Sequence, residues 1–312
     1  MREWRCGAAF ARTGNFITVL VMWLALLTSP LQALATQTQS GISESADDLV
    51  RATIQHEIAS DHSAIKHMFR SWKQTGRGTQ THLYAETTQA TADLLIANNG
   101  KPVPEQQMKT QLASLNQLAR SPQDLNRKQK QEAEDADRSH RIMRALPAAF
   151  LYEYDGTQQG SPTIGKPGDE LIRLKFRPNP SFVPPTHVER VLLGMQGHLL
   201  IDKSQLRIAE IDATLFKDVT FGWGFLGRLD QGGSFFVDQA DVGDGVWELT
   251  RQRLNFTGKI MMIKSFAIKS EEVYSGFSLI PTSTDFEQGV HLLEAQVHQI
   301  RKEDRETANA SH

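Results

Sequence analysis

Apolar residues recur along the chain with two different spacings, and these spacings separate helical segments from extended ones. Between Ala46 and Ile58 apolar side chains return every four residues, which predicts a helix. Runs in which apolar and polar residues alternate follow, separated by turn-forming segments at 76–78 and 98–100. These runs, which predict short strands, are 69–73, 79–86 and 94–97.

A long helical stretch interrupts these strands. Apolar residues form one stripe over 108–118, with spacings of three or four residues. Ser121 followed by Pro122 predicts a new helix start, because serine caps helix N-termini and proline is tolerated in the first turn. Over 126–141 nearly every residue is polar or charged, with both signs interspersed. Such a run is typical of a solvated helix face, and a surface for a protein or nucleic-acid partner is the alternative.

The second half of the chain alternates between apolar and polar residues and is expected to be mostly strand. Frequent turn formers between the runs favour an antiparallel meander. The predicted strands are 149–155, 171–177, 197–202, 206–212, 214–221, 234–242, 246–256 and 259–268. One short helix is predicted at 186–195, where Thr186 and Glu189 have the spacing of a capping box.

A final helix is expected to begin at Thr284, because Glu287 follows at the reciprocal capping position. Its apolar residues form a seam with alternating four- and three-residue steps. The seam consists of Phe286, Val290, Leu293, Val297 and Ile300. Because the seam spans fewer than three heptads, docking on the body of the protein is favoured over a coiled-coil dimer. Residues after Arg301 are expected to fray.

Strands before and after a long helix favour an α+β fold with a curved antiparallel β-sheet covered by helices. Residues 46–281 are expected to form a single domain, with a helical insertion at about 104–146 that includes the long charged helix. Residues 282–312 are expected to form the C-terminal helix and tail. No repeat with the period of a solenoid or propeller is visible.

Composition and charge restrict the class of partner. Hydrophobic residues make up 39% and charged residues 22% of the chain, which is ordinary for a globular protein. The net charge of −2 and the pI near 6.6 lack the basic excess of nucleic-acid binders, so no nucleic-acid partner is expected. The single cysteine, Cys6, lies in a predicted leader, so the mature chain would have no thiol for a disulfide, a metal site or nucleophilic attack.

The N-terminus has the order of a secretory signal peptide. Arginines precede the apolar stretch 16–27, and Ala33-Leu34-Ala35 fits the small-x-small cleavage pattern. Cleavage after Ala35 would leave a flexible leader at 36–45 and a periplasmic or secreted protein that is not integral to the membrane. An uncleaved membrane anchor is the alternative, although the apolar stretch is short for a bilayer span.

Several segments between Leu174 and Phe277 carry a resemblance to known proteins. They are Phe176–Pro180 (FRPNP), Gly197–Asp202 (GHLLID), Asp218–Gly224 (DVTFGWG), Gly232–Phe235 (GGSF) and Val246–Leu249 (VWEL). These segments resemble a family of uncharacterised exported proteins common in acidobacteria. The hairpin around Ile201-Asp202 is also similar to the outer-membrane lipoprotein-sorting (LolA/LolB-like) fold. That resemblance implies an incomplete β-barrel of the lipoprotein-carrier type, closed over helices, with an apolar cavity that binds acyl chains.

No recognisable catalytic or metal-binding motif occurs, so no catalytic residue, cofactor or metal is expected. The run Gly222–Gly227 fits G-x-G-x-x-G, but its flanks predict strands and a hairpin rather than the strand-to-helix turn of a dinucleotide site. Strand alternation places His198, Leu200 and Asp202 on one face. Asp202 precedes a turn and is expected to accept hydrogen bonds from the turn amides. A hydrolase whose site assembles from distant residues is a remaining alternative.

Aromatic residues and methionines crowd the predicted strands of the second half and are the candidate apolar ligand-binding residues. They are Phe221, Trp223, Phe225, Phe235, Trp247 and Met262. They would either fill the concave side of the sheet as ordinary core or line an open pocket. We expect an exported, non-enzymatic protein that binds an apolar ligand, such as a lipid, or a lipidated partner such as a lipoprotein. A structural or interaction module of the cell envelope, acting on a protein partner, is the alternative.

Overall fold

The computed structural model describes residues 45–60, 65–222, 227–243, 245–261 and 263–310. In these residues one 13-stranded antiparallel sheet forms the body of the protein. Its strands are β1 (Lys66–Thr75), β2 (Gly78–Ala85), β3 (Ala92–Asn98), β4 (Lys101–Pro102), β5 (Phe150–Gln159), β6 (Glu170–Pro178), β7 (Met195–Asp202), β8 (Arg207–Leu215), β9 (Val219–Phe221), β10 (Gly227–Leu229), β11 (Ser234–Asp241), β12 (Trp247–Ile260) and β13 (Lys264–Ile280).

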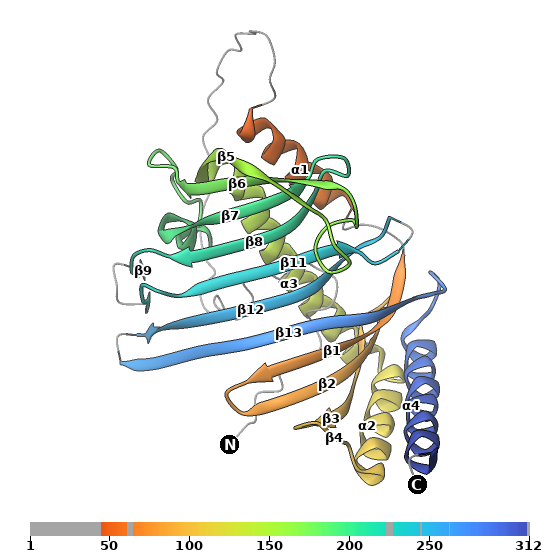
Figure 1. Ribbon diagram of the computed structural model, residues 1–312. Helices are drawn as coiled ribbons and strands as arrows, with labels where there is room; N and C mark the ends of the chain where they lie inside the picture. Colours follow the sequence, from red (N-terminus) through yellow and green to blue (C-terminus); the bar gives the residue numbers. More distant parts are fainter. Residues whose placement is uncertain (1–44, 61–64, 223–226, 244, 262, 311–312) are drawn as a thin grey trace.

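The strand order is β4-β3-β2-β1-β13-β12-β11-β8-β7-β6-β5, and β10 pairs with both β12 and β9. Because β4 and β5 lie at opposite ends of this order, the sheet does not close into a barrel. Figure 1 shows the resulting open, curved sheet. The expected α+β fold with a curved antiparallel sheet and a C-terminal helix is confirmed.

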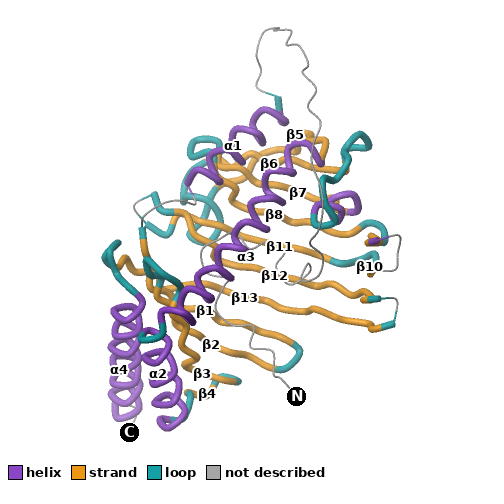
Figure 2. The backbone as a smooth tube through the Cα atoms, turned by 180° about the vertical axis from the view of Figure 1, so that it is seen from behind, coloured by secondary structure: helices purple, strands orange, loops and turns teal. Residues whose placement is uncertain are grey.

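Helices cover the two faces of the sheet at different ends. They are α1 (Ala46–Ser60), α2 (Glu105–Ala119), α3 (Pro122–Ala149), the 3-10 helix η1 (Glu189–Gly194) and α4 (Phe286–Ala310). Figure 2 shows α3 crossing in front of the strands from β6 to β1, with α1 beside its C-terminal end. Helices α2 and α4 pack instead at the β1–β4 end. We call the face under α3 the inner face and the opposite one the outer face.

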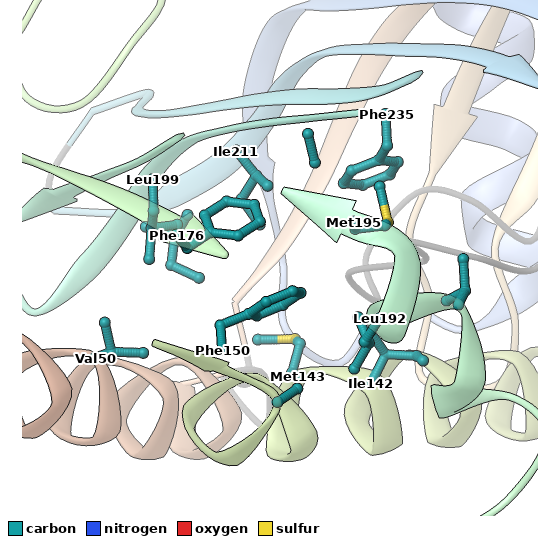
Figure 3. Packing of buried hydrophobic residues seen from close by; sticks show 14 of the residues in the cluster. Val50, Ile142, Met143, Phe150, Phe176, Leu192, Met195, Leu199, Ile211 and Phe235 are labelled. Atoms are coloured by element: carbon teal, nitrogen blue, oxygen red, sulfur yellow. The ribbon is translucent and has the colours of Figure 1, made fainter. Parts of the chain in front are cut away.

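The main core lies between α1, α3, η1 and the inner face of β5 to β12. Aromatic and branched side chains of alternate strand positions form its sheet layer, as the two-residue period of a strand requires. In Figure 3 Phe176 and Phe235 point from the strands toward the helices, where Met143 of α3 points back toward them. All three are less than a tenth exposed, so this end of the inner face is ordinary apolar core.

A second cluster, the α4 core, lies on the outer face at the other end of the sheet. Leu83 and Tyr84 are neighbours on β2 and so point to opposite faces, and Leu83 packs with α4. The predicted seam docks here: Phe286, Val290 and Leu293 have no exposed surface. Docking on the body of the protein is therefore confirmed for the seam.

The start of α4 differs from its predicted capping. The amide of Gln288 donates to the Asp285 carboxylate at 2.8 Å, and the amide of Asp285 donates back to the Gln288 side chain at 3.0 Å. The hydroxyl of Thr284 instead donates to the carbonyl of Pro281. The predicted capping box at Thr284 is thus wrong by one residue, because two adjacent residue types could both cap the helix.

Helix α3 joins the two cores. Ser121 accepts a hydrogen bond from the amide of Asp124 and Pro122 occupies the first turn, which confirms the predicted start. Leu125 in the first turn packs in the α4 core, whereas Ile142 near the other end packs in the main core. The helix continues past Pro147 to Ala149, beyond its expected end. On its exposed side Arg141 pairs with Asp137 at 3.2 Å, in keeping with a solvated face.

Two predicted strand boundaries are wrong. The segments 206–212 and 214–221 are mainly one strand, β8, with the short β9 after it. The segment 259–268 contains a hairpin turn between β12 and β13 rather than continuous strand. Apolar residues run through this turn, so no composition change marks it in the sequence.

No helix within the described residues is long and apolar enough to cross a membrane. The predicted signal peptide, its cleavage position and nearly all of the predicted leader lie outside the described residues.

Candidate functional site

The inner face changes from apolar to polar between β11 and β1. Val237 of the main core lies opposite Gln252 on β12, and Gln252 lies opposite Glu272 on β13. Directly opposed residues of antiparallel strands share a face, so these three side chains lie on the inner face. Lys73 lies opposite Glu272 in the same way, and Tyr274 opposite Ser71. We call Ser71, Lys73, Tyr84, Gln252, Glu272 and Tyr274 the polar patch.

Glu272 is the charged centre of the polar patch and is only 4% exposed. Ser71 Oγ donates to its Oε1 at 2.5 Å, and Lys73 Nζ lies 3.1 Å from its Oε2. Ser71 is fully buried, whereas the side chain of Lys73 is 32% exposed. A buried carboxylate is costly unless it is paired and hydrogen-bonded, so these two partners explain how the sheet holds this charge.

Two buried tyrosines lie beside Glu272. Burial, followed by the charge of Glu272, raises the pKa of Tyr274. Burial, followed by the charge of Asp93, raises the pKa of Tyr84. Both phenols are therefore neutral and able to donate a hydrogen bond at physiological pH.

The hydroxyl of Tyr274 is buried beside the Glu272 carboxylate, but it makes no hydrogen bond of good geometry among the described residues. Most buried polar groups are paired, so a buried hydroxyl without a well-formed hydrogen bond is a candidate contact for a bound molecule. A donor of this kind beside a carboxylate suits a ligand group that both accepts and donates a hydrogen bond, such as a hydroxyl or an amide.

A row of stacked rings extends from the polar patch along β1. Phe69 stacks on Tyr84 with ring centroids 5.2 Å apart, and on Phe277 with centroids 5.3 Å apart. His82 stacks on the far side of Tyr84 and contacts the carboxylate of Asp93 at 2.5 Å. The row offers flat apolar surfaces with polar groups at its edge, which is a lining suited to an amphipathic molecule.

A buried histidine lies at the other end of this row. His67 is 2% exposed and meets Phe277 edge to face. Its Nδ1 lies 3.1 Å from Oε1 of Glu248, and its backbone amide donates to Glu86 at 2.8 Å. The inner face near β1 thus holds two carboxylates around one imidazole.

The more buried stripe of α3 is also polar in its first half. Lys128, Glu132, Asp135 and Ser139 follow one another at helical spacing, and Asp135 and Ser139 are buried. Burial raises the pKa of Glu132, although Lys128 Nζ lies 2.8 Å away, and Glu132 also accepts a hydrogen bond from the amide of Thr91. Asp135 pairs with Arg138 on its own helix. A polar helix surface therefore crosses a partly polar sheet face (Figure 2).

The structure brings together only some of the predicted ligand-binding residues. Phe235 is buried in the main core and Phe221 packs partly buried against it. Trp247 lies on the outer face with Leu171 and Leu200, so the expected single lining is wrong for this residue. A register shift in the β11–β12 pair lies between Phe235 and Trp247, so alternation counted from Phe235 does not predict where Trp247 packs. Trp223, Phe225 and Met262 lie outside the described residues.

The predictions for the β7 strand are confirmed. Leu199 lies in the main core and Leu200 in the outer-face cluster, as the alternation around His198 and Asp202 requires. Asp202 Oδ1 accepts hydrogen bonds from the amides of Ser204 and Gln205 at 3.0 and 3.1 Å. Asp202 is therefore a turn-capping residue.

The outer face carries an acidic pair that the sequence did not reveal. Asp238 is 3% exposed and lies directly opposite Glu210 on β8. Burial and then the charge of Glu210 raise the pKa of Asp238 to about 7, although Arg251 and Arg253 act in the other direction. Burial also raises the pKa of Glu210. This pair can hold and release a proton near neutral pH. Within the described residues no group of three or more His, Cys, Asp or Glu could hold a metal ion.

The polar patch was not predicted from the sequence, because residues 270–277 were not predicted as strand. Their sequence is rich in serine and glutamate and shows little apolar alternation. The aromatic residues Tyr274 and Phe277 were the one sign in this segment of a strand that packs against other residues. Their shared face follows only from the observed register and bulges of β1 and β13.

The sequence matches no protein-family model and no curated protein. Among solved structures it is matched to the crystal structure of a DUF1329 family protein from Desulfovibrio piger, at 11% sequence identity. The match covers 74% of this chain and 91% of that chain, with a TM-score of 0.25. A similarity at this level supports no assignment of fold or function.

Proposed function

We propose that this protein is an exported, non-enzymatic carrier that binds an amphipathic ligand between α3 and the inner face of the sheet. The buried hydroxyl of Tyr274, which lies beside Glu272 without a well-formed hydrogen bond, is the observation that carries the proposal. The apolar part of the ligand would lie on the ring row and the adjoining main core. Its polar group would meet Tyr274 and Glu272 in the polar patch.

The ligand class follows from the two halves of the inner face. Rings and aliphatic side chains favour an acyl chain or another flat or extended apolar group. A tyrosine hydroxyl beside a carboxylate favours a polar ligand group that accepts a hydrogen bond from the hydroxyl and donates one to the carboxylate. A lipid, or the lipid part of a lipidated protein, with a hydroxyl or amide near its acyl chain combines both properties.

The polar patch is costly if it serves stability alone. Leaving one buried donor unpaired costs roughly 1–3 kcal/mol, and the same position could hold phenylalanine without that cost. Residues that lower stability in the absence of an evident structural gain are expected at functional sites. The predicted signal peptide and the resemblance to the lipoprotein-sorting fold agree with such a carrier and form part of the proposal.

The alternative, an interaction module of the envelope, has less support. Its candidate contact surface was the terminal seam, which is buried against β2, β3 and α2. The other candidate was the charged face of α3, whose exposed side chains pair with one another along the helix.

Tyr274→Phe tests the proposal without disturbing the fold. The variant removes a buried hydroxyl that lacks a well-formed hydrogen bond, so its free energy of unfolding should equal or exceed that of the wild type. Ligand affinity should fall roughly fivefold to tenfold, the equivalent of one hydrogen bond of about 1 kcal/mol. Tyr154→Phe, at a 53% exposed position on β5, is the matched control.

The measurement is mass spectrometry of lipids that co-purify without detergent, followed by titration of the identified lipid into stripped protein. The wild type and the Tyr154 variant should carry the same lipid, and the Tyr274 variant should carry less. Equal lipid content and affinity in all three proteins, or no lipid in any of them together with no binding of added lipids, would refute the proposal.

A further inference from the structure

The hairpin between β12 and β13 ends in an exposed apolar tip. Ile260 is 42% exposed, Met261 69% and Ile263 90%. The amide of Ile263 donates to the carbonyl of Ile260, and this hydrogen bond closes the hairpin. Apolar side chains that stay this exposed bury little surface on folding, so this tip contributes little to the core.

The residue types at this turn also conflict with its backbone. Met261 has a φ of +49°, in the left-handed region that glycine, asparagine and aspartate occupy at least cost. A turn selected only for hairpin formation would be expected to use those residues. The positive φ of Met261 costs conformational energy, and the exposed apolar side chains lower solubility. These two costs favour a functional role for the tip rather than a role in stabilising the fold.

Other exposed apolar residues lie along the same rim of the sheet. The end of β8 lies opposite the start of β7, and it also lies next to the start of β11. The turns at these strand ends are therefore on the same rim of the sheet as the β12–β13 tip (Figure 1, left). Phe216, directly after β8, is 36% exposed, and Val183, in the segment that leads to η1 and β7, is 82% exposed.

The rim near the tip is basic. Lys259 and Lys264 flank the tip and are exposed, and Lys217 Nζ lies 5.2 Å from the ring centroid of Phe216. Nearby acidic charge is partly compensated, since Arg228 pairs with both Asp218 and Asp230. Apolar side chains flanked by lysines are the combination that inserts into a bilayer surface while the ammonium groups meet lipid phosphates.

We infer that this rim docks on the surface of a membrane that contains anionic lipids, with the β12–β13 tip inserted among the head groups. A lipid surface fits better than a protein partner, because the tip is a narrow projection. A specific protein interface usually buries about 800 Å² on each partner with a well-packed centre. The inference does not depend on which ligand the polar patch binds.

A fluorescent probe at the tip tests docking directly. Cys6 is the only cysteine, so Cys6→Ser combined with Met261→Cys allows a single environment-sensitive dye to be attached at the tip. Leu279→Cys in the same background is the control, because Leu279 is 60% exposed and lies at the opposite end of β13. Vesicles of phosphatidylcholine alone, and of phosphatidylcholine with about a third phosphatidylglycerol, are then added to the full chain.

Docking predicts a blue-shifted, brighter emission from the dye at 261 with the anionic vesicles and no change from the dye at 279. Lys259→Gln with Lys264→Gln should weaken this response about tenfold and make it insensitive to salt. Ile260→Ser with Ile263→Ser should reduce it by at least tenfold, with an unchanged circular dichroism spectrum. A dye at 261 that stays in water with every vesicle, or equal responses at 261 and 279, would overturn the inference, as would protection of the tip by a protein partner without any response to lipid.

Discussion

Asp238 and Glu210 are directly opposed on the outer face, and the raised pKa of Asp238 links stability to pH. The pKa of Asp238 is raised to about 7 in the folded protein from its ordinary value of 3.8. Between these values the folded state binds more protons than the unfolded state. The stabilisation from Asp238 is therefore fully present below about pH 4 and is lost as the pH rises through 7. Asp238→Asn should remove this part of the pH dependence.

Urea unfolding at about pH 5 and about pH 8 measures this effect. At the higher pH the Asn variant should be more stable than the wild type, and at the lower pH the difference should shrink. Asp137→Asn, on the exposed side of α3, removes the same charge as a control and should leave the pH profile unchanged. Parallel profiles for the wild type and the Asp238 variant would show that the pair shares no proton.

Gly289 allows α4 to approach the sheet closely. A Cβ at this position would lie 2.6 Å from Cγ2 of Thr87. Glycine inside an exposed helix usually costs about 1 kcal/mol relative to alanine, so Gly289→Ala would otherwise be expected to stabilise the protein. Here we expect it to lower the free energy of unfolding by about 1–3 kcal/mol through overpacking.

Thr87→Ser removes the clashing methyl group and keeps the hydroxyl that donates to the carbonyl of Ala90. In a double-mutant cycle the serine should recover most of the loss caused by Gly289→Ala. Additive effects of the two substitutions would mean that the close approach is not the cause.

Residue-scale predictions succeeded where the signal is local. Ser121 caps α3 and Asp202 caps its turn because each side chain bonds to amides two or three residues away. The start of α4 was placed one residue early because Asp285 competes with Thr284 as cap. Tyr274 could not be recognised, since its environment comes from β1 and β2, about 200 residues earlier in the chain.

At the scale of elements, the docking of α4 has a measurable consequence. Leu293 has no exposed surface, and Leu293→Ala should lower the free energy of unfolding by about 2–5 kcal/mol. Gln299→Ala, at an exposed position of the same helix, should change it by less than about 0.5 kcal/mol. The unfolding midpoint should not depend on protein concentration, whereas a seam buried between two chains would make it do so.

Strands were predicted well where one side is apolar and poorly where both sides are polar. The β7 strand contains a compact apolar run that is buried on both sides, and it was predicted nearly to the residue. The long β13 strand was predicted only as far as Ile268, because the next four residues, 269–272, are all polar or charged. A polar strand is stabilised by its neighbours on both sides, and this information is not contained in its own sequence.

At the scale of the whole molecule, the α+β class and the open antiparallel sheet could be predicted from the order of helices and strands. The distribution of helices over two faces could not. It depends on strand order, in which β1 lies beside β13 rather than beside β5. For the same reason the polar patch, which combines strands from both ends of the chain, is visible only in the folded protein.

A single helix anchored in two cores also determines how the protein melts. Leu125 and Ile142 lie on the same helix, α3. Loss of the α4 core would remove the packing around Leu125 and would thereby weaken the packing of Ile142 in the main core. Two separately folded units would melt as two calorimetric peaks. We expect instead one endotherm whose van't Hoff and calorimetric enthalpies agree, even though the apolar clusters occupy opposite sides of the sheet.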